Sequence, residues 1–250
     1  MSRWSAILQQ QGHRPYPVPQ RAWAMTMSWC DLLFAHWPID RAVLRELVPQ
    51  GLELDTFDGR AWVGVVPFRM ANTGPRGLNR VPGVSAFAEL NVRTYVIRDG
   101  RPGVWFFSLD AASRLAVYGA RWIFHLPYFH ARMRCERTGD EVSYRSERRH
   151  RRAPPGAFVG RYRPTGPVYR SQPGTLEHWL TERYCLYSAD RRGGIYRAEV
   201  HHAPWPLRPA KAQIETCTVT DGWGIHLPDT PPILHFADRL DVLGWWIVRA

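Results

Sequence analysis

Short apolar segments alternate with small clusters of proline and glycine along most of this chain, a pattern typical of a protein built from many short strands. Alternation of apolar and polar residues at period two is clearest over 52–57 and 86–97. Further strands are predicted at 28–37, 60–68, 104–110, 126–133, 142–148, 184–188, 194–201, 212–219 and 240–248. Helical spacing predicts three short helices, at 41–47, 111–124 and 175–183, with Asp40, Asp110 and Thr175 as their N-caps. The pattern therefore predicts a mainly β protein of the α+β class, with mostly antiparallel strands.

Two connections in this pattern carry further information. Asp58-Gly59 separates the alternating segment 52–57 from the apolar segment 60–68, and Asp-Gly between two such segments predicts a hairpin. Residues 69–84 are polar and rich in Gly and Pro, which predicts a loop of a length usually reserved for function.

The segment 86–97 has two different faces. The apolar face should contact a core, and it carries Ala88, Leu90, Val92, Thr94 and Val96. The other face carries a polar row made of Glu89, Asn91, Arg93 and Tyr95. In a barrel or cone this row lines an interior cavity, whereas in an open sheet it faces water. The pattern alone leaves both arrangements open.

Composition limits the chemistry that the chain can perform. Of its 250 residues 45% are hydrophobic, which excludes wholesale disorder. Its 33 basic residues exceed its 22 acidic ones by 11, and Lys211 is the single lysine among them. A Schiff-base enzyme needs an amine, so such chemistry could use Lys211 or the N-terminus alone.

The arginine surplus has two readings. It can form a surface for nucleic acid or another anion, and the densest run, 145–152, is the candidate. Alternatively it reflects a preference for arginine over lysine along the whole chain. The near absence of lysine favours the second reading, because surfaces that follow phosphates normally use both residues. Nucleic acid is therefore not an expected partner.

The expected compartment is the cytoplasm. The first twenty-five residues contain three arginines and several prolines, without the continuous apolar stretch of a secretory signal. No uninterrupted apolar segment approaches the length of about 18 residues that a spanning helix needs. The four cysteines, Cys30, Cys135, Cys185 and Cys217, form no C-x-x-C pair, so reduced thiols are expected.

Several of these segments resemble the YqjF-like family of proteins of unknown function. The resemblance is carried by residues 87–95 (FAELNVRTY) and 102–110 (PGVWFFSLD), and by similar segments at 54–62, 180–184 and 201–207. That family is grouped by fold with acetoacetate decarboxylase. The resemblance implies a cone-like antiparallel β-barrel with flanking short helices, in which residues 1–250 form a single domain and 1–24 an N-terminal extension. Because the decarboxylases of this fold are oligomeric, the resemblance also implies a homo-oligomer.

The resemblance also bears on mechanism. The decarboxylase pattern has a glutamate on a strand, a Gly-Arg-Glu step and a Gly-x-Pro-Lys-Lys segment that supplies the imine lysine. Glu89 matches the glutamate, and Gly119-Ala-Arg121 approximates the second step with one inserted residue and no glutamate. His125-Leu-Pro127 then leads to Tyr128 and Phe129, so both lysine positions are aromatic. The fold analogy is retained while lysine-imine chemistry is excluded at this place.

Each candidate site residue has a structural alternative. Glu89 is predicted as an acid/base group in a cavity, or else as a buried partner of Arg93. Tyr128 is predicted to donate a hydrogen bond to a ligand, or else to pack in the core. Arg93 or Arg121 is predicted to bind an anionic group, although Arg121 can equally be a surface cation at a helix end.

The remaining candidates are Asn91 and Tyr95, from the polar row, and the pair His201-His202. One of these histidines is expected to reach the cavity as an acid or base. The pair is not predicted to bind a metal, because adjacent strand residues point to opposite faces. No cofactor is expected.

We therefore expect a protein that binds a small organic acid or carbonyl compound in a β-cone cavity. Whether it is an enzyme is left open; an enzyme of this kind would not use a lysine imine. The alternative is an arginine-rich nucleic-acid-binding or regulatory module.

Overall fold

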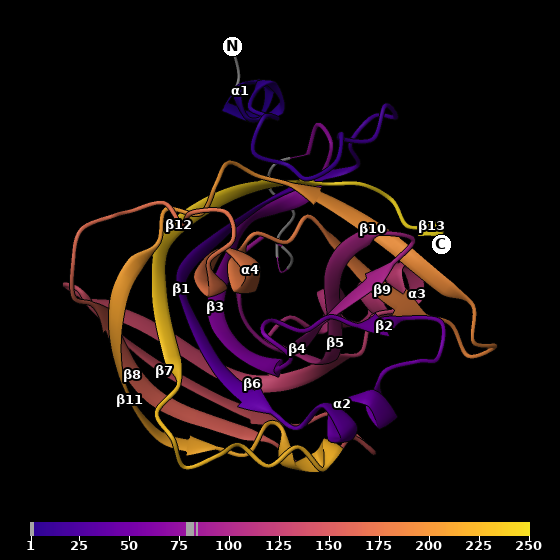
Figure 1. Ribbon diagram of the computed structural model, residues 1–250. Coiled ribbons are helices and arrows are strands. Elements are labelled where there is room, and N and C mark those ends of the chain that lie inside the picture. Colours follow the sequence, from indigo (N-terminus) through magenta and orange to yellow (C-terminus); the bar gives the residue numbers. More distant parts are fainter. Residues whose placement is uncertain (1–2, 79–82, 84) are drawn as a thin grey trace.

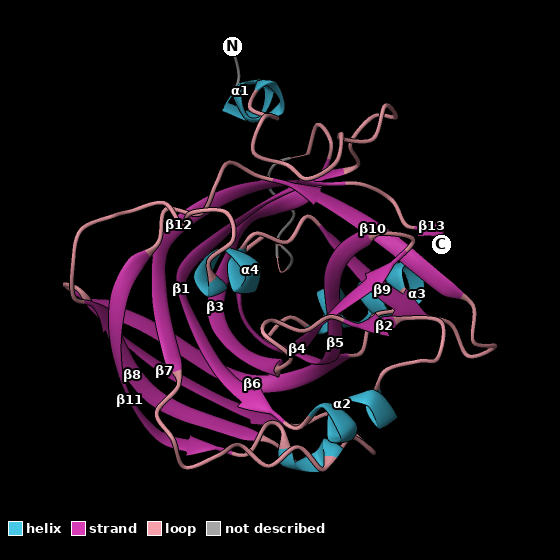
Figure 2. Cartoon of the chain, viewed as in Figure 1, coloured by secondary structure: helices cyan, strands magenta, loops and turns pink. Residues whose placement is uncertain are grey.

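The computed structural model describes residues 3–78, 83 and 85–250. The strands are β1 (Met25–Ile39), β2 (Glu53–Leu54), β3 (Ala61–Pro75), β4 (Phe87–Arg98), β5 (Arg101–Ala111), β6 (Tyr128–Thr138), β7 (Glu141–Arg148), β8 (Ala157–Pro164), β9 (Cys185–Ala189), β10 (Ile195–His201), β11 (Arg208–Cys217), β12 (Ile233–Gly244) and β13 (Val248–Arg249). The helices are α1 (Arg3–Gln9), α2 (Arg41–Leu47), α3 (Arg114–Phe124) and α4 (Leu176–Thr181), and a short 3₁₀ turn, η1, spans Asp221–Trp223. Strands dominate the chain (Figure 2), so the predicted mainly β class is confirmed.

The strands close into two rings that share a wall (Figure 1). The shared wall is formed by β12, β1, β3, β4 and β5, paired in that order. The strands β6, β7, β8 and β11 complete the large ring, because β6 pairs with β5 and β11 with β12. The strands β9 and β10 complete the small ring in the same way. These pairs are antiparallel except where β5 meets β6 and β9, in agreement with the predicted antiparallel cone.

The shared wall explains the two faces of β4. Successive residues of a strand point to opposite sides, and here each side faces the inside of one ring. Leu90 and Val92 face the large ring, whose interior is packed with Tyr144, Phe158, Tyr162 and Phe236. Glu89 and Asn91 point the other way, into the small ring, and are buried. Ring closure therefore places the polar row inside the molecule and not in water.

Two of the three predicted helix N-caps are correct. The carboxylate of Asp40 accepts a hydrogen bond from the backbone N–H of Ala42 (2.8 Å) and caps α2, as predicted. Thr175 caps α4, also as predicted. The N-cap of α3 is Ser113, whose hydroxyl accepts from the N–H of Ala116 (3.1 Å). The prediction for Asp110 is wrong because β5 continues to Ala111, and Asp110 is a buried strand residue there.

Two predicted connections need correction. Asp58 and Gly59 have φ values of 48° and 75°, as a tight hairpin turn requires, and a single bridge joins Phe57 to Arg60. The flanking segments do not pair as one hairpin, because β2 pairs with β4 instead. The predicted loop 69–84 is also too long, since β3 continues to Pro75. Residues 79–82 and 84 lie outside the described residues.

One long strand and one α-helix were not predicted from the sequence. The first is β8, which pairs with β7 and β11 in the large ring. The second is α1, whose Trp4 packs against Leu243 and Trp245 near the end of β12. In the segment that follows α1 in the chain, Arg14 forms a 3.3 Å ion pair with Glu199 of β10. The N-terminal segment is thereby fixed to the outside of the small ring.

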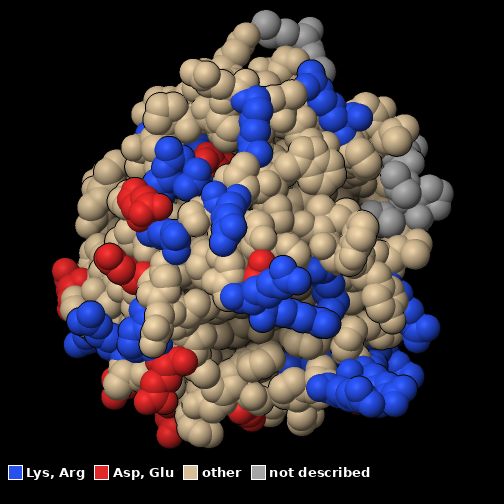
Figure 3. Space-filling view, turned by 90° about the vertical axis from the view of Figure 1, so that its right-hand side faces the viewer, with Lys and Arg blue, Asp and Glu red and all other residues tan. Residues whose placement is uncertain are grey.

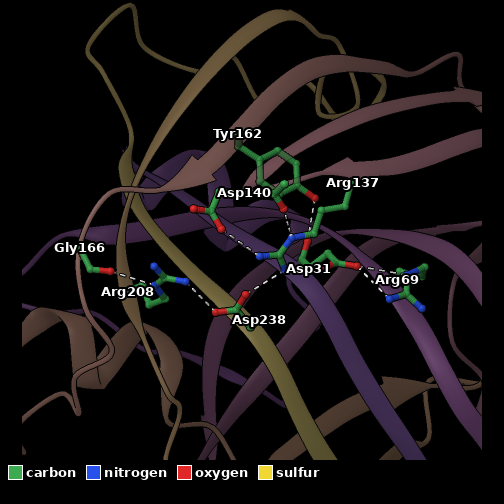
Figure 4. A network of polar contacts seen from close by, with 9 residues as sticks. Asp31, Arg69, Arg137, Asp140, Tyr162, Gly166, Arg208 and Asp238 are labelled. Carbon is green, nitrogen blue, oxygen red and sulfur yellow. Dashed lines mark hydrogen bonds and ion pairs between the residues drawn. The ribbon is translucent and has the colours of Figure 1, made fainter.

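A polar network crosses an irregular point of β1 (Figure 4). Asp31 has a positive φ of 53° and lies where the pairing with β3 shifts register. Its carboxylate forms ion pairs with Arg69 (2.9 Å) and Arg137 (3.0 Å), and Arg137 extends to Asp238 (2.8 Å). The hydroxyl of Tyr162 donates to the carbonyl of Asp31 (2.8 Å). These contacts join β1 to β3, β6, β8 and β12 where the ladder is interrupted.

The arginine run 145–152 is not exposed throughout. Arg148 is buried, and its guanidinium forms a 2.7 Å ion pair with Asp110. Arg149 is paired with Glu147 on the surface (2.7 Å). On the face shown in Figure 3, basic side chains form separate groups divided by uncharged and acidic residues. On that face the arginine surplus is dispersed.

Two features bear on the expected compartment. No helix among the described residues is both long and apolar enough to cross a membrane. All four cysteines are free thiols.

Candidate functional site

The small ring encloses a cavity of about 310 Å³. Apolar side chains of β1, β3, β4, β5, β9 and β10 form most of its wall, and α3 covers one side. Leu115 and Ile123 of α3 line the cavity, as does Trp246, and all three are exposed. These three side chains mark the mouth of the cavity.

Glu89 and Tyr128 meet inside this cavity. The hydroxyl of Tyr128 donates a 3.1 Å hydrogen bond to Oε2 of Glu89, and both residues are buried. Burial raises the pKa of Glu89 to about 8, although hydrogen bonds from Tyr128 and Asn91 oppose the change. Burial also raises the pKa of Tyr128 well above its ordinary value, and the nearby Glu89 adds to this. At neutral pH most Glu89 carboxyls are therefore protonated and can donate a hydrogen bond.

The two aromatic residues at the expected lysine positions point in different directions. Tyr128 faces the cavity. Phe129 packs on the other side, with its ring 5.5 Å from His150 and 6.1 Å from Trp223 between centroids. Lys211 is exposed on β11, opposite Arg163 of β8, and does not line the cavity. Among the described residues the cavity therefore contains no amine.

A smaller space, about 60 Å³ in volume, adjoins the cavity, and we call it the annex. Asn91 lines both spaces, together with five apolar residues, Trp29, Phe68, Phe106, Leu186 and Val200. Arg93 lines the annex and not the larger cavity. The polar row is thus divided between two adjoining spaces.

Tyr95, the last residue of the row, does not line either space. Its hydroxyl donates to the carbonyl of Leu180 (2.8 Å) and lies 2.7 Å from Nε2 of His36. Its ring packs against Trp179, with 4.5 Å between centroids. Tyr95 therefore packs and forms hydrogen bonds outside both spaces.

The anion role predicted for Arg121 is not supported by its position. Arg121 is an exposed residue near the end of α3, and its Nη1 donates to the backbone carbonyl of Tyr128 (2.7 Å). The alternative of a cation at a helix end describes it correctly.

The two histidines also lie outside the cavity lining. Nε2 of His201 bonds the carbonyl of Ile7 (2.9 Å), beneath the N-terminal segment. His202 stacks on Tyr184, with 4.7 Å between ring centroids, and its Nδ1 bonds the carbonyl of Ala203 (2.7 Å). No group of three or more His, Cys, Asp or Glu side chains among the described residues could hold a metal ion.

Sequence reasoning missed two groups that line these spaces. The first is the inner face of α3, whose small residues Ala116, Gly119 and Ala120 recur at helical spacing along the cavity. The second is the pair Arg183 and Trp205. Both also make contacts within the fold, since Arg183 pairs with Asp55 (2.6 Å) and Trp205 stacks on Trp29. Their place in the annex wall could not be read from a local pattern, because only ring closure brings them to Arg93.

The fold, two fused strand rings with a cavity in the smaller one, is acetoacetate decarboxylase-like. Acetoacetate decarboxylase from Legionella pneumophila subsp. pneumophila str. Philadelphia 1 matches with a TM-score of 0.60 and 12% identity, over 98% of this chain and 95% of that chain. The enduracididine biosynthesis enzyme MppR complexed with pyruvate matches with a TM-score of 0.63 and 13% identity, over 95% and 93% of the two chains. An acetoacetate decarboxylase-like enzyme from Sphingomonas wittichii RW1 matches with a TM-score of 0.59 and 14% identity, over 95% of this chain and 98% of that chain. At these identities the similarity establishes the fold alone.

The chain belongs to the DUF2071 family, described as "Uncharacterized conserved protein", whose model matches residues 26–241. It is also 49% identical over 228 residues to "Uncharacterized protein YqjF" of Bacillus subtilis (strain 168). That alignment covers 91% of this chain and 93% of the relative. The resemblance noted in the sequence is therefore confirmed.

Proposed function

We propose that this protein binds a small organic acid or carbonyl compound in the cavity of the small ring, with an oxygen of the ligand beside Glu89. Any turnover there uses Glu89 as the acid/base group and proceeds without a lysine imine. The observation that carries the proposal is the buried Glu89 carboxyl, hydrogen-bonded to Tyr128 in a mostly apolar cavity.

The chemistry of the cavity wall supports this class of ligand. A protonated carboxyl in apolar surroundings can donate a hydrogen bond, and the carbonyl oxygen of a ligand can accept it. The volume of about 310 Å³ lies at the lower end of the range for small-molecule pockets. Because most of the wall is apolar, the rest of the ligand should be a short hydrocarbon group.

The fold neighbours support the same class. One of them, MppR, was captured in complex with pyruvate, which is both an acid and a carbonyl compound. Another carries the name of a decarboxylase that acts on acetoacetate. These ligands belong to those proteins, and they favour a related ligand class here by analogy of fold alone.

The test is a titration with butanone, hexanone and octanone and with the acids of the same chain lengths, with hexane as a probe that lacks the carbonyl group. Trp29, Trp245 and Trp246 line the cavity, so tryptophan fluorescence reports binding alongside calorimetry. We expect the ketones to bind the wild-type protein, and Glu89→Met to weaken ketone binding about tenfold because one hydrogen bond is lost. Ketone affinity should also fall as the pH rises through about 8, since the ionised carboxylate no longer donates.

The matched control is Glu215→Met, which removes an exposed carboxylate from β11. It should leave ketone binding unchanged, and hexane binding should be the same in both variants. If neither the ketones nor the acids bind, or if Glu89→Met and Glu215→Met bind them equally, the proposal fails.

A further inference from the structure

The structure assigns the annex as a binding site for a carboxylate group, held by Arg93, Arg183 and Trp205. This site differs from the Glu89 end of the cavity in its residues and in the charge that it accepts. It does not depend on the function proposed for Glu89.

Four residues that line the annex each have a buried polar atom without a hydrogen-bond partner among the described residues. Three of these atoms are donors, namely Nε of Arg93, Nη2 of Arg183 and Nε1 of Trp205. The fourth is an acceptor, Oδ1 of Asn91. Buried polar groups are nearly always hydrogen-bonded, so four such residues in the lining of one small space point to a polar occupant.

The charges around the annex specify an anion. Arg183 already has a counter-ion, because its Nη1 donates to Asp55 (2.6 Å) and its Nε to the carbonyl of Trp179 (2.7 Å). Arg93 has neutral partners: its Nη2 donates to the carbonyl of Leu180 (3.1 Å) and lies 3.5 Å from the hydroxyl of Tyr95. No described carboxylate forms an ion pair with Arg93. A guanidinium inside a protein is costly without a counter-charge, and a bound anion supplies it.

The remaining walls limit the size and shape of the occupant. Aromatic side chains line the annex, and the guanidinium carbon of Arg93 lies 5.2 Å from the ring centroid of Phe34. The volume of about 60 Å³ is larger than one water molecule needs and suits a planar group of a few atoms. A carboxylate matches both the space and the forked donors of an arginine. Because the annex adjoins the larger cavity at Asn91, the rest of an acid can extend toward Glu89; that extension, unlike the annex itself, rests on the proposed function.

The experiment measures thermal unfolding and calorimetric binding with sodium formate, acetate and butyrate, with the corresponding amides, and with sodium chloride at equal concentration. The variants are Arg93→Met, Arg93→Lys and Trp205→Phe, and the matched control is Arg132→Met, which removes an exposed guanidinium from β6. We expect carboxylates to bind the wild-type protein and Arg132→Met, and the amides not to bind. Arg93→Met should weaken carboxylate binding about 10- to 100-fold, and Arg93→Lys should restore part of it.

Each other outcome counts against the assignment. It is overturned if no carboxylate binds the wild-type protein, as an annex that holds only water would predict, or if carboxylates bind Arg93→Met as tightly as Arg132→Met. It is also overturned if chloride stabilises the protein as much as formate, which would indicate a halide site. Should Arg93→Met fail to fold, Trp205→Phe alone must still weaken formate binding, since it deletes one of the three donors and keeps an aromatic ring. Loss of ketone binding in Glu89→Met with formate binding intact separates this site from the Glu89 site.

Discussion

The hydroxyl of Tyr128 lies 3.1 Å from Oε2 of Glu89, so the residue at the expected position of an imine lysine instead donates a hydrogen bond to the buried carboxyl. The tyrosine leaves Glu89 as the titrating group of the pair near neutral pH, because the pKa of Tyr128 is raised well above its ordinary value. The chemistry available at this position has therefore changed from an amine nucleophile to proton donation.

The buried carboxyl of Glu89 should make stability fall as the pH rises. Its pKa is about 8 in the folded protein against an ordinary value of 4.5, so between these values the folded state binds a proton that the unfolded state has lost. The contribution is complete below about pH 4.5 and is lost as the pH rises through about 8. In urea unfolding across this range, wild type should lose up to about 1.4 kcal/mol per pH unit more than Glu89→Gln.

The control for this measurement is Glu215→Gln, which changes an exposed carboxylate. Its stability should follow the wild-type pH dependence throughout. Parallel curves for wild type and Glu89→Gln would show that Glu89 is ionised in the folded protein at neutral pH.

Borohydride trapping should distinguish this protein from a lysine-imine enzyme. A ketone condenses with an amine to an imine and water. Borohydride then reduces the carbon–nitrogen double bond of the imine and leaves a stable secondary amine. Lys211 is exposed and outside the cavity, so pyruvate with borohydride should leave no adduct within the cavity wall of the wild-type protein. Tyr128→Lys should yield an adduct at the substituted position, because burial lowers the pKa of an amine and keeps part of it neutral. Peptide mass mapping checks both; a rapid stoichiometric adduct at Lys211 in the wild-type protein would contradict this account.

Acid should loosen the N-terminal segment. Burial lowers the pKa of His201 to about 4, and the positive charges of Arg14 and of the neighbouring His13 and His202 act in the same direction, against the hydrogen bond to Ile7. The unfolded state therefore binds a proton before the folded state does, and this stabilisation is lost as the pH falls from about 6.5 through 4. Hydrogen exchange of residues 3–16, corrected for its intrinsic pH dependence, should show weaker protection at acid pH in wild type. His201→Gln should reduce the change and the exposed-site control His226→Gln should not; equal behaviour of the two variants would assign it to other groups.

Local patterns in the sequence were enough to predict most strands and both faces of β4. They could not decide whether the polar face was buried, because that depends on β9 and β10 closing the small ring far along the chain. Arg121 shows a second limit. Its spacing from Gly119 resembled a family motif, yet its side chain donates a hydrogen bond to the backbone carbonyl of Tyr128, at the start of β6. An alignment of motifs conveys no information about side-chain direction.

Three further features that the sequence did not predict also have physical explanations. Asp110 has the side chain of a good N-cap, but its ion pair with Arg148 of β7 holds it in the strand, and Ser113 caps the helix three residues later. In β8 the buried residues Phe158, Gly160 and Tyr162 do alternate, but the glycine interrupts the apolar signal. The annex was not predicted, since Arg93 and Arg183 are ninety residues apart and meet through the position of α4 inside the small ring.

Gly119 offers a way to fill the cavity without disturbing its wall. It lies on the cavity side of α3, and a Cβ added there would meet no atom within 4 Å. Gly119→Ala should therefore stabilise the protein by about 1 kcal/mol, because alanine is the better helix former. That gain corresponds to a rise of about 2–4 °C in Tm for a chain of this size.

Gly119→Phe should project a ring into the same open space, preserve folding and weaken hexanone binding at least about tenfold, since the ring occupies volume that the ligand needs. Calorimetric titration of both variants checks this: if Gly119→Phe binds hexanone as tightly as Gly119→Ala, the ligand does not occupy the part of the cavity under α3.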